Sequence, residues 1–162
     1  MLSPDRIEES ALNVVLVYPE IPWNTGAVGR TCLAAGAKLH LVEPLGFSLE
    51  AREVKRAGLD YWPRVDPRCW PNWESFEDRL SELGEPLLFS AEGRVDLWDA
   101  PATEKPVLIF GCESAGLPKA IRRRYEDRLV SIPMVDPQLR SLNLSTSVAL
   151  ALYEMRRRRL GK

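Results

Sequence analysis

The chain has 162 residues, of which 45% are hydrophobic and 28% are charged, and its 22 basic residues nearly balance its 23 acidic ones. This composition is typical of a single globular domain. The balanced charge excludes a polycation that coats nucleic acid indiscriminately, so any site for RNA must be local.

Short apolar runs alternate with helical patterns along the chain. Runs rich in β-branched residues, without polar alternation, are typical of strands buried on both faces. We expect a polar leader over residues 1–12 and one domain over residues 13–162. The expected strands are residues 13–18, 39–42, 86–90, 107–110 and 129–132, and the expected helices are one ending at Gly36 and others over 49–57, 74–83, 119–124 and from 144 onward. This alternation predicts an α/β fold with a mainly parallel sheet flanked by helices.

Two stretches lack a clean period. Residues 61–73 are rich in Pro, Trp and Arg and are expected to form a loop-rich connection. Residues 92–105 are a polar link between two strands. The last helix, in contrast, has an apolar stripe that includes Val148 and Leu152, and a second apolar side that includes Leu150 and Tyr153. That helix is therefore expected to be buried on two sides.

Several kinds of site are disfavoured. The three cysteines are far apart and show no C-x-x-C spacing, so we expect a reducing, cytoplasmic location and no metal site. No stretch approaches the roughly 20 apolar residues of a membrane span, and none has the pattern of a signal peptide. The only histidine, His40, lies in an apolar strand, which favours a packed side chain over a catalytic triad.

Three segments that follow strands carry the functional information, because ligands of parallel sheets gather at the carboxyl ends of strands. The first, PEIPWNTGAVGR, opens a helix with a glycine turn that can hold an anion, and it places Arg30 away from the core. The second, FGCESAGLP, has Gly111 and Gly116 for close backbone approach, with Glu113 as its only charge. The third, IPMVDPQLRSLNLSTS, has more polar groups than a helix N-cap requires, which suggests a small polar ligand.

Each of these features also has a plain structural interpretation. Arg30 alone is compatible with an ordinary surface arginine, and the Gly111 loop with a simple turn before a helix started by Pro118. The basic clusters at residues 122–124 and 156–159 are compatible with solvated helix ends. The cluster at residues 122–124 is also a candidate contact for RNA.

Together, the three segments resemble the motifs of the SpoU branch of the SPOUT RNA methyltransferases, in their order and spacing. The resemblance covers nearly the whole chain after the leader and is strongest for the small single-domain tRNA methyltransferases of the TrmL type. It rests on PEIPWNTGAVGRTC, LIFGCESAGLP and IPMVDPQLRSLNLSTSVALALYE.

The resemblance implies a C-terminal trefoil knot, a homodimer, and S-adenosylmethionine as cofactor. It implies 2′-O-methylation of tRNA, at the wobble cytidine or uridine of the anticodon loop. A ribosomal RNA 2′-O-methyltransferase and a non-catalytic RNA-binding module of the same fold remain as alternatives. By similarity, the cofactor would lie near Ala91, Gly111, Ile132, Ser141 and Leu142, and the catalytic group would comprise Arg30, Asn143 and Glu113.

An arginine side chain stays protonated at neutral pH and is therefore a poor general base. Our hypothesis is therefore that Arg30 clamps a phosphate and stabilises the developing alkoxide. Proton removal is then left to a phosphate oxygen or to water.

Overall fold

A computed structural model describes residues 12–50 and 60–161 of the chain. Its centre is a seven-stranded sheet in which every strand pair is parallel and the strand order is β3-β2-β1-β6-β4-β7-β5. The strands are β1 (Asn13–Val17), β2 (Lys38–Val42), β3 (Arg68–Trp70), β4 (Glu85–Phe89), β5 (Val95–Asp96), β6 (Pro106–Phe110) and β7 (Leu129–Ser131). The expected α/β class and parallel sheet are confirmed.

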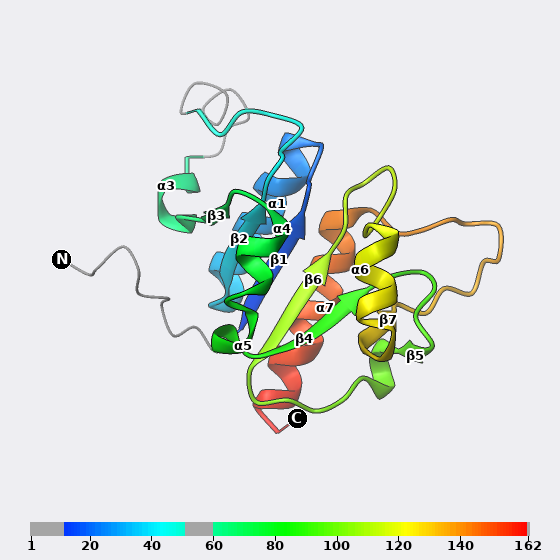
Figure 1. Cartoon of the computed structure of the whole chain (residues 1–162). Coiled ribbons are helices and arrows are strands. Elements are labelled where there is room, and N and C mark those ends of the chain that lie inside the picture. Colours follow the sequence, from blue (N-terminus) through cyan, green and yellow to red (C-terminus); the bar gives the residue numbers. More distant parts are fainter. Residues whose placement is uncertain (1–11, 51–59, 162) are drawn as a thin grey trace.

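Helices cover both faces of this sheet. They are α1 (Pro22–Ala35), α3 (Trp62–Val65), α4 (Trp73–Glu77), α5 (Leu80–Leu83), α6 (Lys119–Arg124) and α7 (Leu144–Arg159), with short 3-10 turns η1 (Leu97–Asp99) and η2 (Glu126–Arg128). The long helices α1 and α7 pack together on one face, and α4 and α6 lie on the other (Figure 1). No helix among the described residues is long and apolar enough to span a bilayer.

The central strands form because their sequences are apolar on both sides. Every residue of β1 and of β6 is buried. Their side chains alternate between two core clusters, one under α1 and α7 and the other under α4 and α6. Such burial on both faces is what a parallel sheet covered by two helical layers requires. The two faces of the sheet are therefore covered, and a ligand can reach it at its edges and loops.

The prediction of a loop-rich connection over residues 61–73 was wrong. This stretch contains α3 and the edge strand β3, which pairs with β2. Both are too short to show a period, and tertiary contacts hold them in place. One such contact is the Trp70 indole N–H, which donates to His40 Nδ1 at 3.1 Å.

Two other predictions need correction. The helix expected over residues 74–83 is divided into α4 and α5, and α4 begins at Trp73 because the Asn72 side chain accepts the Ser75 N–H at 2.8 Å. The polar link 92–105 contains β5 and η1. The helix expected over residues 49–57 lies mostly outside the described residues.

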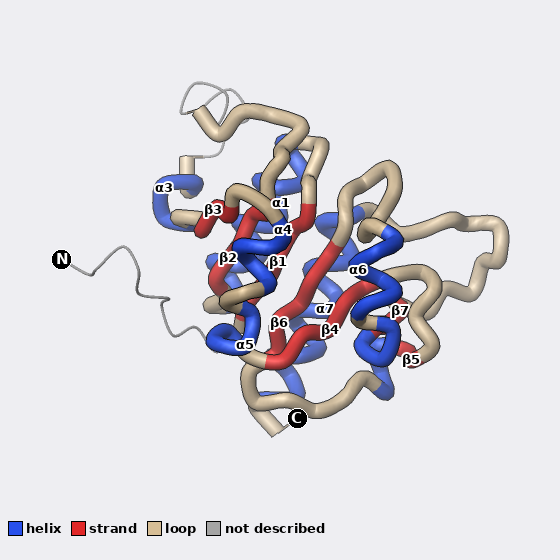
Figure 2. The backbone as a smooth tube through the Cα atoms, viewed as in Figure 1, coloured by secondary structure: helices blue, strands red, loops and turns tan. Residues whose placement is uncertain are grey.

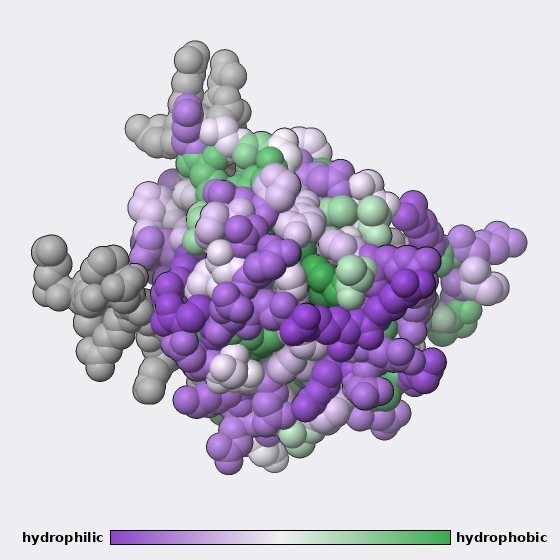
Figure 3. Space-filling model, in the orientation of Figure 1, coloured by the Kyte–Doolittle hydropathy of each residue, from purple (hydrophilic) through white to green (hydrophobic). Residues whose placement is uncertain are grey.

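The last helix is buried on one side within the chain. Val148 and Leu152 are fully buried, whereas Leu150 and Tyr153 are 44% and 48% exposed. The loop before α7, residues 132–143, projects from the body of the molecule (Figure 2). Opposite the α1–α7 layer, the face over α4 and α6 is largely hydrophilic (Figure 3). About half of the surface of Leu150 and of Tyr153 thus remains uncovered by the described part of the chain.

Candidate active site

A pocket of about 540 Å³ lies at the carboxyl edge of the sheet. Its lining comes from the segments that follow β1, β4, β6 and β7, together with the start of α7. Apolar walls are provided by Phe89, Phe110 and Leu117, and polar groups by Asn24 and Ser141 among others. A cavity of this size, in which apolar walls meet an equal share of polar groups, suits a small organic ligand with both apolar and polar parts.

The pocket brings together nearly all the residues that the sequence singled out. Its lining includes Ala91, Gly111, Glu113, Ile132, Ser141, Leu142 and Asn143. Arg30 does not belong to this lining. The three informative segments therefore converge in space, although 79 residues separate the first from the second.

Gly111 is required by the fold of the loop after β6. A Cβ atom built on Gly111 would lie 2.0 Å from the carbonyl carbon of Gly116 and 2.1 Å from the Leu117 nitrogen. The loop closes on itself through the Gly116 N–H, which donates to the Cys112 oxygen at 2.9 Å, and Gly116 has a φ of +68°. The chain can turn this tightly at the pocket only because both positions lack a side chain.

The Glu113 carboxylate binds the start of α1. It accepts hydrogen bonds from the backbone N–H of Glu20 at 2.8 Å, from the N–H of Ile21 at 3.1 Å and from Asn24 Nδ2 at 3.4 Å. A negative charge here also complements the positive end of the α1 dipole. Both carboxylate oxygens are thus engaged in holding the helix start.

The contact between these two loops is reciprocal. The Glu20 carboxylate accepts from the Ser114 hydroxyl at 2.6 Å and from the Ser114 N–H at 3.3 Å. Hydrogen bonds from Cys112 and Ser114 lower the pKa of Glu20. The Arg140 guanidinium donates to the backbone carbonyl oxygen of Ser114 at 2.6 Å, which ties the β7–α7 loop to the same place. Sequence reasoning did not single out Glu20, Ser114 and Arg140, although all three lie within the motif segments, because their partners are 26 to 94 residues away along the chain.

Asn143 is the N-cap of α7. Its Oδ1 accepts from the Thr146 N–H at 3.2 Å and from the Ser145 hydroxyl at 2.6 Å, while its Nδ2 donates to Asn24 Oδ1 at 3.2 Å. Ser141 and Ser147 are not needed for the cap and line the pocket. The surplus of polar groups in this segment is therefore divided between helix capping and the pocket wall.

Arg30 lies on the exposed side of α1, with its Cζ 5.7 Å from the centre of the Tyr61 ring. No carboxylate in the described ranges 12–50 and 60–161 forms an ion pair with it. By helix geometry, Arg30 lies about 9 Å along the axis from Asn24 and on a different side. Its guanidinium is therefore accessible to an anion. Such an anion would not lie in the pocket of the same chain.

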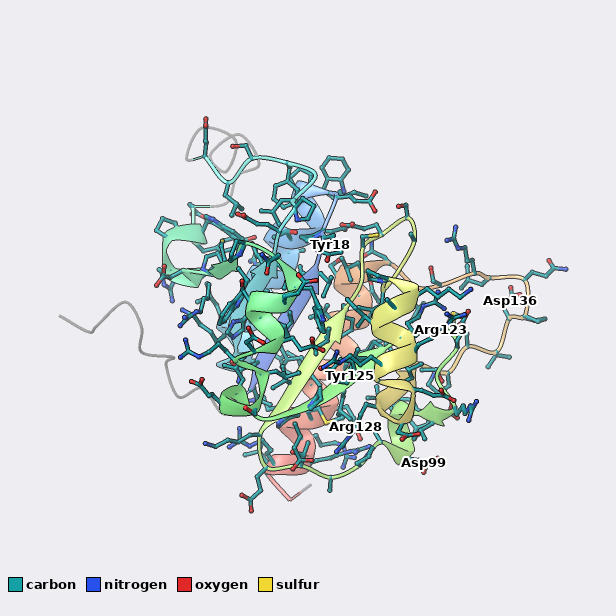
Figure 4. The ribbon with its side chains drawn as sticks, in the orientation of Figure 1. Tyr18, Asp99, Arg123, Tyr125, Arg128 and Asp136 are labelled. Atoms are coloured by element: carbon teal, nitrogen blue, oxygen red, sulfur yellow. The ribbon has the colours of Figure 1, made fainter. Side chains whose placement is uncertain are left out.

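The basic cluster on α6 is largely compensated by acidic neighbours. Arg122 pairs with Glu92, and Arg124 pairs with Glu77 at 2.9 Å. Figure 4 shows Arg123 on the outer side of α6, and Tyr125 at its end. The positive charge of two of the three arginines is therefore compensated by a carboxylate, which weakens their attraction for a phosphate. Within the described residues, no group of three or more His, Cys, Asp or Glu side chains is arranged to hold a metal ion.

A parallel sheet with a pocket between the loops at its carboxyl edge defines an α/β ligand-binding protein. The model of the SpoU rRNA methylase family matches residues 11–153. The chain therefore belongs to the SpoU methylase family.

Similar proteins and solved structures support this family assignment. A tRNA (cytidine(34)-2′-O)-methyltransferase of Aeromonas hydrophila is 42% identical over 145 residues, which cover 88% of this chain and 91% of that protein. A solved structure that concerns the 2-OH methylation of C/U34 on tRNA has a TM-score of 0.86 and 44% identity, and the match covers 95% of this chain and 99% of that one.

A second solved structure contains the cofactor. The SpoU methyltransferase AviRb of Streptomyces viridochromogenes, in complex with AdoMet, has a TM-score of 0.79 and 27% identity. The match covers 96% of this chain and 60% of that one. The described sheet and helices are thus those of the methyltransferase family.

Proposed function

We propose that this protein is an S-adenosylmethionine-dependent methyltransferase that acts in the cytoplasm on tRNA. Its target is the 2′-hydroxyl of the wobble cytidine or uridine in the anticodon loop. The observation that carries the proposal is the convergence of three family motifs on one pocket, in a chain 42% identical to a named tRNA (cytidine(34)-2′-O)-methyltransferase. An anticodon loop suits such an enzyme because its unstacked bases are accessible to a protein.

The pocket fits the cofactor in size and chemistry. Apolar walls next to the tight turn at Gly111 suit an adenine ring, and the backbone of that turn offers hydrogen-bonding groups. Ala91, Gly111, Ile132, Ser141 and Leu142 would hold the cofactor. When bound, the cofactor supplies an electrophilic methyl group on its sulfonium.

The polar residues have two kinds of role in the proposed reaction. Glu113 and Asn143 act by position, because their side chains fix the starts of α1 and α7 on either side of Asn24. Such fixed geometry matters since methyl transfer requires the attacking oxygen to be aligned with the methyl group. Arg30 binds a phosphate of the RNA and stabilises the developing alkoxide, and the proton leaves to a phosphate oxygen or to water.

A homodimer with a trefoil knot at its C-terminal end is part of the proposal. The exposed apolar side chains Leu150 and Tyr153 lie in the same helical layer as the exposed Arg30. A second copy packed on this layer would cover the apolar side chains and bring Arg30 to the junction between two protomers. For the knot, the supporting contact is that of Arg140 with Ser114, between the last loop and the loop after β6.

Mapping of ribose methylations in total RNA, with and without the gene, tests the proposal. We expect loss of one 2′-O-methyl group at position 34 of particular tRNAs. Loss from ribosomal RNA alone would favour the alternative target, and an unchanged map would favour a non-catalytic RNA-binding module.

A further inference from the structure

The ring of Tyr61 lies against the side chain of Arg30. The guanidinium carbon is 5.7 Å from the ring centroid, a distance at which a cation is attracted to the face of an aromatic ring. At its other end, the Tyr61 hydroxyl donates a hydrogen bond of 2.8 Å to the backbone oxygen of Gly26. The side chain thus contacts α1 through both its ring and its hydroxyl.

Gly26 is the residue one helical turn before Arg30. In an α-helix, the carbonyl of residue 26 is also the acceptor for the backbone N–H of residue 30. The hydroxyl therefore binds the same turn of helix from which Arg30 emerges. An arginine with several rotatable bonds is restricted when an anchored ring lies under its guanidinium.

The position of Tyr61 is itself determined by close packing of α3 on α1. A Cβ atom at Gly29 would lie 2.8 Å from Trp62 Cζ3 and 3.1 Å from Val65 Cγ2, so this approach depends on the missing side chain. Trp62 and Val65 are both buried in the core cluster under α1. Tyr61, at the N-cap of α3, is consequently held at a fixed height along α1.

The ionisation of the phenol fits this arrangement. Burial raises the pKa of Tyr61, although the nearby charge of Arg30 opposes the shift. The hydroxyl therefore keeps its proton at neutral pH and can donate to Gly26. Tyr61 does not line the pocket, so it makes no direct contact there.

We infer that Tyr61 is a positioning residue, which fixes the guanidinium of Arg30 in the orientation that meets the RNA. The inference rests on the role proposed for Arg30. It assigns a function to a segment that the three motifs do not include.

A double-mutant cycle tests the inference, with steady-state methylation of tRNA as the readout. Tyr61→Leu removes ring and hydroxyl, and we expect kcat to fall about tenfold with the KM for the cofactor unchanged. Tyr61→Phe keeps the ring and should retain kcat within about threefold. In an Arg30→Ala background, Tyr61→Leu should change kcat by less than about twofold, because the residue acts through Arg30. Equal losses in both backgrounds would overturn the inference.

Tyr125→Phe is the matched control. Its hydroxyl donates to Glu77 at 2.6 Å on the opposite face of the sheet, so the change removes a comparable bond away from Arg30. Kinetics of this variant should match those of the wild type. A loss of kcat as large as that of Tyr61→Leu would show that any tyrosine contact matters, and would count against a specific role for Tyr61.

An NMR measurement separates this inference from the proposed function. The side-chain signals of Arg30, assigned through Arg30→Lys, should show an upfield ring-current shift in the wild type and in Tyr61→Phe. Unshifted signals in the wild type would overturn the positioning role even if tRNA is methylated. Shifted signals without methylation of any RNA would support the fixed guanidinium and overturn the proposed reaction.

Discussion

The side-chain amide of Asn143 donates a hydrogen bond to the side-chain oxygen of Asn24 at 3.2 Å, across 119 residues of chain. Asn24 in turn donates to Glu113 at 3.4 Å. These three side chains connect the start of α7, the start of α1 and the loop after β6. The geometry of the pocket thus depends on polar contacts as well as on the apolar core.

The first prediction concerns the charge of Glu113. Glu113→Gln replaces one of two accepting oxygens by an amino group, which then faces the backbone N–H of Glu20 or Ile21, just before α1, instead of accepting from it. The variant should lose about 1–3 kcal/mol of unfolding free energy, and its kcat should fall together with its stability. Denaturant titration and methylation kinetics measure the two effects.

Glu126→Gln provides the control for this change. Glu126 pairs with Arg94 at 3.2 Å, and both side chains are more than half exposed. Removal of such a surface pair should cost less than about 1 kcal/mol. If Glu113→Gln is no more harmful than this control, the carboxylate does not organise the site.

The second prediction concerns the tight turn at Gly111. Gly111→Ala places a methyl group 2.0 Å from the carbonyl carbon of Gly116, so this loop, which lines the pocket, must shift. Affinity for the demethylated cofactor, measured by calorimetry, should fall by at least about tenfold. Gly36→Ala is the comparison, because Gly36 has a φ of +70° and open space around it. That variant should lose about 1 kcal/mol of stability and bind the cofactor normally.

The third prediction concerns association through α7. Tyr153→Glu and Leu150→Glu place charges on the exposed apolar side of the helix. Sedimentation velocity should show a dimer for the wild type and a dissociation constant raised by about 100-fold or more for the variants. Arg94→Glu changes a charge at a site that is 82% exposed and lies outside α7, and it should leave the dimer intact. A monomeric wild type at micromolar concentration would refute the dimer.

The fourth prediction concerns pH and His40. Its Nε2 lies 3.0 Å from Asn13 Oδ1, and its Nδ1 accepts from Trp70, so the ring is bound in its neutral form. Burial, with smaller contributions from Lys38 and Arg68, lowers the pKa of His40 from 6.5 to about 3. The packed histidine expected from the sequence is confirmed.

His40 contributes less to the stability of the folded protein as the pH falls. Above pH 6.5 the histidine is neutral in both states and its contribution to stability is complete. As the pH falls from 6.5 toward 3, only the unfolded chain takes up the proton, which costs up to about 1.4 kcal/mol per pH unit. Urea unfolding at pH 7 and pH 5 should show this loss for the wild type, and a smaller loss for His40→Gln. Parallel losses in both proteins would contradict the assignment.

The sequence was sufficient to predict the central strands but not the edge strands. β1 and β6 are continuous apolar runs, and their burial follows from composition. β3 and β5 have three and two residues, and they exist because a neighbouring strand offers hydrogen bonds. Pairing of this kind depends on tertiary structure and leaves no periodic signal.

The candidate site, too, could be predicted from the sequence only in part. The motif loops indicated where the pocket forms, because strand ends of a parallel sheet meet at one edge. The partners of Glu113 lie 92 and 93 residues away, so the sequence could not indicate that its oxygens bind the start of α1. The place of Arg30 outside the pocket lining likewise depends on how α1 lies against α3 and α7.

The most direct test of the proposed reaction uses the purified protein, an unmodified tRNA transcript and S-adenosylmethionine with a labelled methyl group. The nucleosides are then separated and identified by mass spectrometry. We predict labelled 2′-O-methylcytidine or 2′-O-methyluridine from position 34, and none from a transcript with a 2′-deoxy sugar at that position. A label on a base, or equal labelling of the deoxy transcript, would contradict 2′-O-methylation of the wobble nucleotide.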